Sequence, residues 1–165
     1  MRFYSFTNAN YMNQLQLGLQ TAHCVADMAT KYLVHVDNEA YNDWAVNHKT
    51  IIILNGGNCA MLNELYNFMD DLRNPYPYTK FNEDEQSLAG AITCVGIVLP
   101  EEVYETARLL RNRTFFKIEG AFNHVFRSTD DILENARLQE LCDFYNSASP
   151  WTFEFINRLN SCGMA

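Results

Sequence analysis

The sequence predicts a small α/β protein with a mixed sheet of about four strands flanked by helices. Two runs, a largely β-branched one over 50–54 and a mostly apolar one over 91–99, have the composition of buried strands in an α/β sheet. Segments with the apolar spacing of helices lie between and after these runs. The chain has 165 residues, of which 48% are apolar, and this is enough for one domain with a substantial core.

The first third of the chain predicts two strands and two helices. Residues 2–7 alternate and are rich in aromatic side chains, which indicates a strand. A helix is expected over 12–32, with Asn10 as its cap and an apolar stripe formed by Leu15, Leu19, Ala22, Ala26 and Ala29. A short helix follows over 39–46. The β-branched run 50–54 is typical of a strand that is covered on both faces in the middle of a sheet.

The next segments complete the predicted sheet. Residues 59–72 carry one apolar stripe and predict a helix. A strand over 78–82, an acidic loop over 83–87 and a strand over 91–99 follow, and we expect these two strands to be antiparallel. Pro100 and two glutamates then open another helix, at the end where the helix dipole favours acids.

Residues 114–165 are expected to form a helical extension of an α/β domain that spans 1–113. Residues 130–145 predict an amphipathic helix, and Ser149-Pro150 starts another. The extension is expected to pack on the core or on a second subunit. We expect a homo-oligomer, in the simplest case a symmetric dimer, in which Trp151, Phe155 and Leu159 cross between subunits.

The net charge of −8 is unevenly distributed. Residues 1–107 hold five bases and thirteen acids, whereas 108–127 hold five bases and one acid. An acidic chain repels polyanions at long range, so a nucleic-acid partner would need the basic segment, whereas a small anionic ligand in a pocket is less sensitive to the overall charge.

Several classes are excluded by pattern. The longest apolar run, 91–100, is too short to span a bilayer, and the N-terminus lacks the pattern of a secretory signal. Five cysteines without metal or redox spacing indicate reduced thiols. We therefore expect a cytoplasmic protein with no metal and no cofactor.

Three segments carry a resemblance to a known family. The first helix contains Met12-Asn13-Gln14-Leu15-Gln16-Leu17-Gly18-Leu19-Gln20-Thr21-Ala22-His23, Trp44 shortly precedes the run 50–54, and the last strand reads Gly90-Ala91-Ile92-Thr93-Cys94-Val95-Gly96-Ile97. In this order the segments resemble the class II peptidyl-tRNA hydrolases, whose first motif is Met-Ser-x-Gly-Lys-x-Ala-Ala-Gln-x-x-His and whose closing strand is Gly-Thr-x-Thr-Val-Leu-Ala-Ile. The resemblance covers about residues 2–110 and implies the fold of that family.

The same resemblance implies that the catalytic part has changed. The family's helix lysine falls on Gln16, and its Asp-x-x-x-Thr loop falls on the segment from Glu83 to Ser87. Gln20, His23 and Thr93 are kept. A neutral amide cannot stabilise a developing oxyanion or attract phosphate as an ammonium group does. The resemblance therefore supports the scaffold more than the reaction.

Polar residues near these motifs are the candidate ligand contacts. Asn13, Gln16 and Gln20 fall on one side of the first helix and can hydrogen-bond a base or a sugar, although an ordinary solvated face has the same pattern. His23, one turn after Gln20, is either a contact or a buried histidine with satisfied hydrogen bonds. Ser87 is a possible polar liner.

Glu83 and Thr93 belong to the same candidate site. Glu83 can accept a hydrogen bond from a ribose hydroxyl if it occupies the family's aspartate position. A loop of three acids is, however, usually just solvated. Thr93 is a second polar liner, at the end of a strand. Arg111 and Arg113, in the basic and phenylalanine-rich segment 108–127, are expected to meet a phosphate, although such a segment can also neutralise a helix dipole and fill a core.

Two functions follow from these residues. The first is a non-catalytic binding protein whose former catalytic cleft sequesters a small nucleotide-derived ligand. Compact acidic proteins rich in asparagine and tyrosine on an eroded enzyme scaffold are similar to bacteriophage accessory proteins, some of which sequester nucleotide signals of bacterial immunity, such as cyclic ADP-ribose derivatives or cyclic dinucleotides.

The alternative is a divergent peptidyl-tRNA hydrolase, with tRNA as its partner, that cleaves the ester of peptidyl-tRNA. A third interpretation is a structural protein that acts through its C-terminal helices. Gln16 and the acidic charge count against the hydrolase, so we expect the binding protein.

Overall fold

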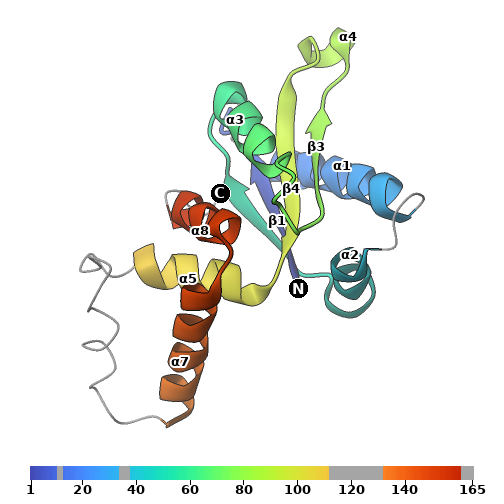
Figure 1. Ribbon diagram of the computed structural model, residues 1–165. Coiled ribbons are helices and arrows are strands. Elements are labelled where there is room, and N and C mark those ends of the chain that lie inside the picture. Colours follow the sequence, from blue (N-terminus) through green and yellow to red (C-terminus); the bar gives the residue numbers. More distant parts are fainter. Residues whose placement is uncertain (11–12, 34–37, 112–131, 161–165) are drawn as a thin grey trace. The chain divides into compact units, whose positions relative to one another are not determined.

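The computed structural model describes residues 1–10, 13–33, 38–111 and 132–160 (Figure 1). These residues form two compact units, one from Met1 to Pro100 and a second that begins at Glu101. The boundary expected from sequence, between 113 and 114, lies outside the described residues. Along the chain, the two units that the structure describes meet before the helix that starts at Glu101.

The first unit is an α/β unit with a four-stranded mixed sheet. Strands β1 (Arg2–Thr7), β2 (Ile51–Asn55), β3 (Tyr78–Asn82) and β4 (Ile92–Leu99) are arranged in the order β2-β1-β4-β3. β1 pairs parallel with β2, and β4 pairs antiparallel with both β1 and β3. The predicted α/β class, the mixed four-stranded sheet and the antiparallel pair are thus confirmed.

Strand β2 does not lie in the middle of the sheet, contrary to prediction. It is an edge strand, and only Leu54 of its five residues is buried, whereas every residue of β4 is buried. The central positions belong to β1 and β4 because the chain returns to pair β4 beside β1. A β-branched apolar run therefore identifies a strand here but not its place in the sheet.

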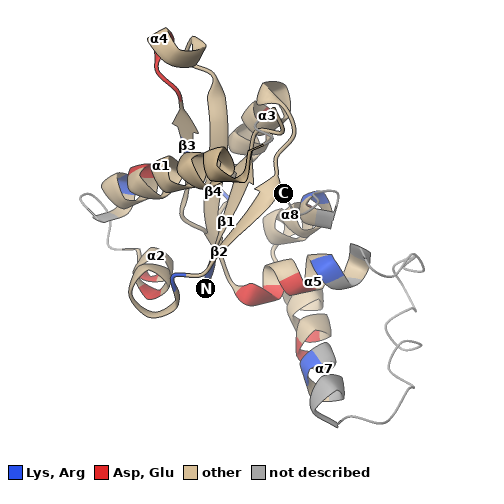
Figure 2. Ribbon diagram, turned by 180° about the vertical axis from the view of Figure 1, so that it is seen from behind, with Lys and Arg blue, Asp and Glu red and all other residues tan. Residues whose placement is uncertain are grey.

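Helices cover both faces of this sheet. α1 (Gln14–Leu33) and α3 (Cys59–Met69) lie on opposite faces (Figures 1 and 2). α2 (Glu39–Asp43) continues directly into a π-helical turn, η1 (Trp44–His48), and a single-turn helix, α4 (Glu85–Leu88), stands in the segment predicted as an acidic loop. Asp84 caps α4, because its Oδ1 accepts the backbone N–H of Ser87 at 2.6 Å.

Helix α1 buries a different side from the one that its apolar spacing predicts. Leu15 and Leu19 are 79% and 53% exposed, and Ala22 and Ala26 are also exposed. The buried positions are Gln20, Thr21, Cys24, Met28 and Tyr32. Polar side chains can be buried on this side of α1 because the sheet offers them partners. The hydroxyl of Ser5, for example, lies 2.7 Å from the hydroxyl of Thr21.

The cap of α1 also differs from the prediction. The Oδ1 of Asn13 accepts the backbone N–H of Leu15 at 2.9 Å, and the Asn13 carbonyl accepts the N–H of Leu17. Asn13, not Asn10, therefore begins the helix.

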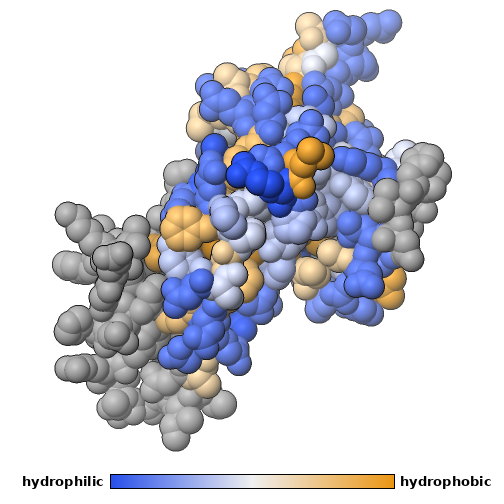
Figure 3. Space-filling view, viewed as in Figure 1, coloured by the Kyte–Doolittle hydropathy of each residue, from blue (hydrophilic) through white to orange (hydrophobic). Residues whose placement is uncertain are grey.

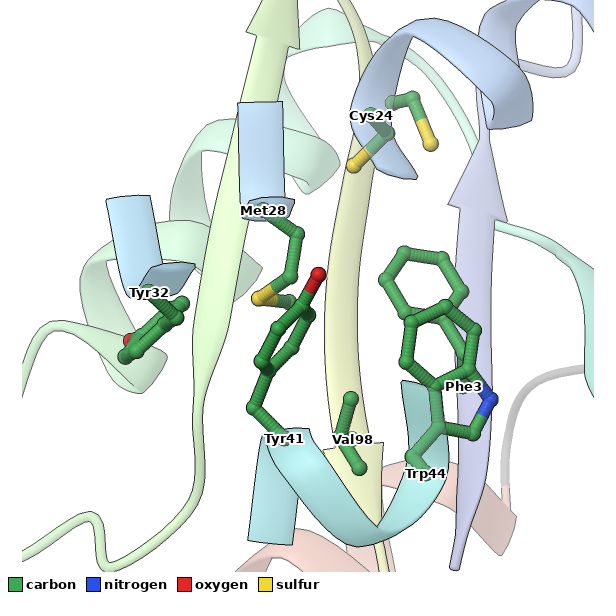
Figure 4. Close-up of a cluster of buried hydrophobic side chains, with 8 residues drawn as sticks. Phe3, Cys24, Met28, Tyr32, Tyr41, Trp44 and Val98 are labelled. Carbon is green, nitrogen blue, oxygen red and sulfur yellow. The ribbon is translucent and has the colours of Figure 1, made fainter. Parts of the chain in front are cut away.

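The hydrophobic core between α1 and the sheet is rich in aromatic rings (Figure 4). It contains Phe3, Cys24, Met28, Tyr32, Tyr41, Trp44, Cys94 and Val98, all of them buried. The ring of Trp44 lies against Phe3 with centroids 5.2 Å apart, and its Nε1 donates to the Thr50 carbonyl at 2.9 Å. η1 thus fixes the chain that enters β2.

The second unit consists of α5 (Glu101–Arg111), α7 (Ile132–Ser147) and α8 (Pro150–Asn160), with α5 in contact with both other helices. Arg137 of α7 donates to Glu105 of α5 at 2.9 Å and lies within 3.5 Å of Glu102. Hydrogen bonds to Glu140 and Glu105, with the nearby charge of Glu102, raise the pKa of Arg137.

Trp151, Phe155 and Leu159 of α8 were expected to cross between subunits. All three are buried within the single chain, and the rings of Trp151 and Phe155 stack with centroids 5.0 Å apart. That expectation is wrong, because side chains that are already covered are not free to meet a second copy.

The surface of the described residues is mostly hydrophilic. On the side seen in Figure 3, most of the described surface is hydrophilic and apolar residues form only small, separate patches. Within the described residues, no helix combines the length and the apolar character needed to cross a membrane.

Candidate functional site

Polar side chains collect where β1 ends and β4 begins. β1 and β2 are parallel and β4 runs against β1, so this edge brings together the last residues of two strands and the first of a third. Thr7, Asn8, Gln20, Glu83 and Thr93 lie here, and we call this set the polar end of the sheet. Ligand sites in open α/β sheets commonly lie beyond the carboxyl ends of parallel strands.

Gln20 is the centre of the polar end. Its side chain is only 3% exposed, and both of its polar atoms are used. The hydroxyl of Thr93 donates to Oε1 of Gln20 at 2.7 Å, and Nε2 of Gln20 donates to Oε1 of Glu83 at 2.7 Å. A relay from Thr93 through Gln20 therefore holds the carboxylate of Glu83 in one position.

A shift in strand register explains how Thr93 reaches α1. Phe81 of β3 lies opposite Cys94, but the next residue, Asn82, lies opposite Ile92. Thr93 is therefore an extra residue on β4 without a partner on β3. Such a bulge interrupts the alternation of side chains and redirects one of them. Thr93 thus lies on the same side as Cys94 and faces Gln20.

Asn8 also belongs to the polar end, although it is not among the residues for which the sequence predicts ligand contact. It is 3% exposed, and its Nδ2 lies 3.1 Å from Sγ of Cys59 and 3.3 Å from the carbonyl of Ile92. Its Oδ1 accepts the N–H of Asn10 at 3.0 Å. An asparagine directly after an aromatic strand is the signal that points to such a role.

His23 of α1 is exposed and not buried. Its ring stacks on Phe81 with centroids 4.6 Å apart and an interplanar angle of 10°. Asp27 follows one turn later, where burial raises the pKa of its carboxyl and the nearby His23 acts in the opposite direction. The accessible ring pair forms a flat platform one turn from Gln20.

The other candidates on or near α1 do not enter this network. Gln16 is exposed, and Asn13 is exposed and caps the helix. The three amides therefore do not act as one surface, because only Gln20 is buried among the strands. Ser87 is exposed in α4, where its N–H meets Asp84.

The sequence offers two candidate phosphate sites, the two arginines and a glycine turn, and the structure fully describes only the turn. Arg113 lies outside the described residues, and so does the side chain of Arg111, whose backbone ends α5. The second candidate is the turn Gly56-Gly57-Asn58 before α3, a sequence that can offer backbone N–H groups to an anion, but two of these groups are used internally. Gly56 donates to the Thr7 carbonyl at 2.8 Å and Gly57 to Oδ1 of Asn55 at 2.8 Å. This favours the plain turn over an anion site.

The electrostatic character of the polar end is acidic. The side chains that hydrogen-bond within the relay are neutral or anionic, and Figure 2 shows the acidic segment that leads into α4. Among the described residues, no three His, Cys, Asp or Glu side chains gather closely enough to hold a metal ion. The site can thus accept hydrogen bonds from hydroxyl or amino groups and stack a ring.

Comparison with known proteins identifies no relative: no protein-family model and no curated protein matches the sequence. The resemblance to class II peptidyl-tRNA hydrolases therefore stays a prediction based on sequence motifs.

Proposed function

We propose that the protein binds a small nucleotide-derived ligand at the polar end and does not cleave it. The observation that carries the proposal is the carboxylate of Glu83, held in place by the buried relay of Gln20 and Thr93. This relay joins three of the residues for which the sequence predicts ligand contact.

The chemistry of the ligand follows from the groups that remain available. Glu83 is half-buried, and Gln20 occupies one of its two oxygens. Its second oxygen can accept a hydrogen bond from a ribose hydroxyl, as carboxylates do in nucleotide-binding sites. The stacked rings of His23 and Phe81 offer a face on which a base can stack.

Cleavage is disfavoured by the residues around the relay. Ester hydrolysis needs a group that stabilises the developing oxyanion, and an ammonium or guanidinium is effective in that role. Here Gln16 occupies the position at which the resembling family has its lysine. Glu83, Asp84 and Glu85 add negative charge, which would oppose an anionic transition state.

The phosphate groups of the ligand are expected to lie away from Glu83. That Arg111 and Arg113 meet a phosphate stays a prediction from the sequence, because the side chain of Arg111 and all of Arg113 lie outside the described residues. Cyclic ADP-ribose derivatives and cyclic dinucleotides fit this division, since each carries ribose hydroxyls, a base and phosphates. Binding without turnover would sequester such a molecule.

The binding experiment compares Glu83→Gln with a matched control, Glu85→Gln, on the exposed first residue of α4. Calorimetry would use adenosine, cyclic ADP-ribose and a cyclic di-adenosine nucleotide as probes. For each probe that binds, Glu83→Gln should weaken binding about tenfold or more and Glu85→Gln should leave it unchanged, because a hydrogen bond to a charged group is worth about 1.5–3 kcal/mol. Equal affinities in both variants would contradict the proposal. Mass spectrometry of molecules released from denatured protein extends the search beyond these probes.

The alternative function is tested with peptidyl-tRNA as substrate. The proposal predicts negligible ester cleavage at neutral pH by the wild-type chain. Gln16→Lys restores the missing ammonium, so cleavage by this variant alone would indicate that the loss of the lysine made the site inactive. Efficient cleavage by the wild-type chain would establish the hydrolase and overturn the binding function.

A further inference from the structure

Helix α1 presents an uncharged, largely apolar face to solvent. This open face consists of Leu15, Gly18, Leu19, Ala22, Ala26, Ala29 and Thr30, all exposed except the half-buried Ala29. The solvent side of a helix that packs on a sheet is normally polar. Figure 2 shows α1 in front of the sheet, with its charged residues confined to its C-terminal half.

We propose that the open face joins two copies of the chain, with the two α1 helices antiparallel across a two-fold axis near Ala22. The spacing of its apolar residues alternates between four and three along Leu15, Leu19, Ala22, Ala26 and Ala29. This spacing keeps one seam along a helix and is characteristic of helices that pack against another helix. The same spacing predicted a core contact, but the sheet covers the opposite side of α1.

The sizes of these side chains select a second, antiparallel copy. Leucines occupy the N-terminal half of the open face and alanines the C-terminal half. An antiparallel copy places Leu15 over Ala29 of the second copy and Leu19 over its Ala26, while Ala22 meets Ala22. Each leucine then meets an alanine and only alanines meet at the axis, so the side chains can pack closely. A parallel pair would oppose leucine to leucine and leave the alanines apart.

The polar and small residues of the open face allow two α1 helices to pack closely. The hydroxyl of Thr30 donates to the carbonyl of Ala26 at 3.0 Å, so burial would leave no unsatisfied group there. Gly18 faces open space, with nothing within 4 Å of the position that a Cβ would take. Small residues allow two helices to approach to about 8 Å, the short end of the usual range.

Charge and size set the strength of the dimer. Two copies of net charge −8 repel each other, although the open face itself is neutral. A 20-residue helix is about 30 Å long, so this pair falls at the small end of specific interfaces, below about 1,200 Å² in total. We therefore expect a reversible dimer that becomes stronger as salt screens the repulsion.

Sedimentation equilibrium of the full chain, over a range of protein and salt concentrations, tests whether the open face forms a dimer. Leu19→Glu should raise the dimer dissociation constant at least about thirtyfold. Met61→Glu on α3 is the matched control, since Met61 is 55% exposed and Leu19 53%, and it should have no effect. A monomer at all concentrations, or equal effects of the two variants, would overturn the proposal.

Two further variants test the antiparallel geometry. Ala26→Leu should weaken the dimer because it opposes leucine to leucine, whereas unspecific apolar association would become stronger. Ala22→Cys should form a disulfide across the two-fold axis under mild oxidation by glutathione disulfide, and Leu15→Cys should not. Crosslinking of Leu15→Cys as efficient as that of Ala22→Cys would indicate parallel helices and contradict the proposal.

Discussion

The two ends of the interface between α1 and the sheet are built from different chemistry. At the polar end, α1 buries Gln20 and Thr21 against hydroxyl groups of the strands. At the other end, which we call the apolar end, Met28 and Tyr32 join Phe3 and Trp44 in the aromatic core. Burial of apolar rings stabilises the fold directly, whereas buried amides contribute little net stability once water is displaced. The contrast indicates that the apolar end holds the helix and that the polar end is available for function.

The largest expected effect is at the apolar end. Trp44→Ala removes a buried indole that packs on Phe3 and donates to the Thr50 carbonyl. Replacement of a core aromatic residue by alanine costs about 3–5 kcal/mol. Urea unfolding followed by circular dichroism measures the loss. A cost below about 1 kcal/mol would mean that η1 is not part of the core that stabilises the sheet.

A smaller effect is expected at the polar end. Gln20→Met keeps similar length but leaves the hydroxyl of Thr93 without its acceptor and frees Glu83. We expect a loss of about 1–3 kcal/mol in the free energy of unfolding, because one buried donor stays unsatisfied. The double variant Gln20→Met with Thr93→Val should recover part of this loss. If the double variant is no more stable than Gln20→Met, the relay does not couple these two residues.

A third effect concerns the outer edge of β3, next to the apolar end. The hydroxyl of Tyr32 donates to the Tyr78 carbonyl at 3.2 Å and accepts the Tyr78 N–H at 3.0 Å, and Lys31 donates to the same carbonyl. Tyr32→Phe removes two of these bonds, so we expect a loss of about 0.5–1.5 kcal/mol. Hydrogen exchange at the Tyr78 amide should accelerate, and unchanged exchange would show that the edge is protected in another way.

The smallest expected effect concerns the stability of the fold at alkaline pH, and it does not arise at neutral pH. A hydrogen bond with Cys94, together with burial, raises the pKa of Cys24 well above its ordinary value of 9.0. The folded chain thus keeps this proton while the unfolded chain loses it, so the free energy of unfolding falls as pH rises above about 9. Cys24→Ala should decline less steeply between about pH 8 and 10 than the wild type. Parallel curves would contradict this assignment.

Sequence patterns identified helices and strands better than the position of each strand in the sheet or the side of each helix that is covered. The strands at 2–7 and 78–82 have the predicted bounds, because alternation and aromatic content are local properties. The edge position of β2 depends on the return of β4 to β1, which no local pattern records. The seam of α1 was assigned to the wrong side because its spacing shows that a face exists but not what covers it.

The candidate site was predicted in part. Gln20, Glu83 and Thr93 were each singled out from motif positions, and the structure brings them together through the bulge at Thr93. Asn8 was missed, since its role depends on Cys59 and Ile92, far away in the sequence. The stacking of His23 also depends on a neighbour, Phe81, that only the folded sheet supplies.

The pairing of β1 with β4 has a consequence for synthesis of the chain. Arg2 lies opposite Leu99, so β1 must wait for the last strand of this sheet to be synthesised. Residues are added at about 5–20 per second, which leaves Phe3, Tyr4 and Phe6 without their final partner for several seconds. Until then β1 can pair only with β2, and the nascent sheet has an unprotected apolar edge where β4 will insert. Vectorial synthesis therefore makes this strand the segment most exposed to misassembly, and a binding chaperone would be most effective in that interval.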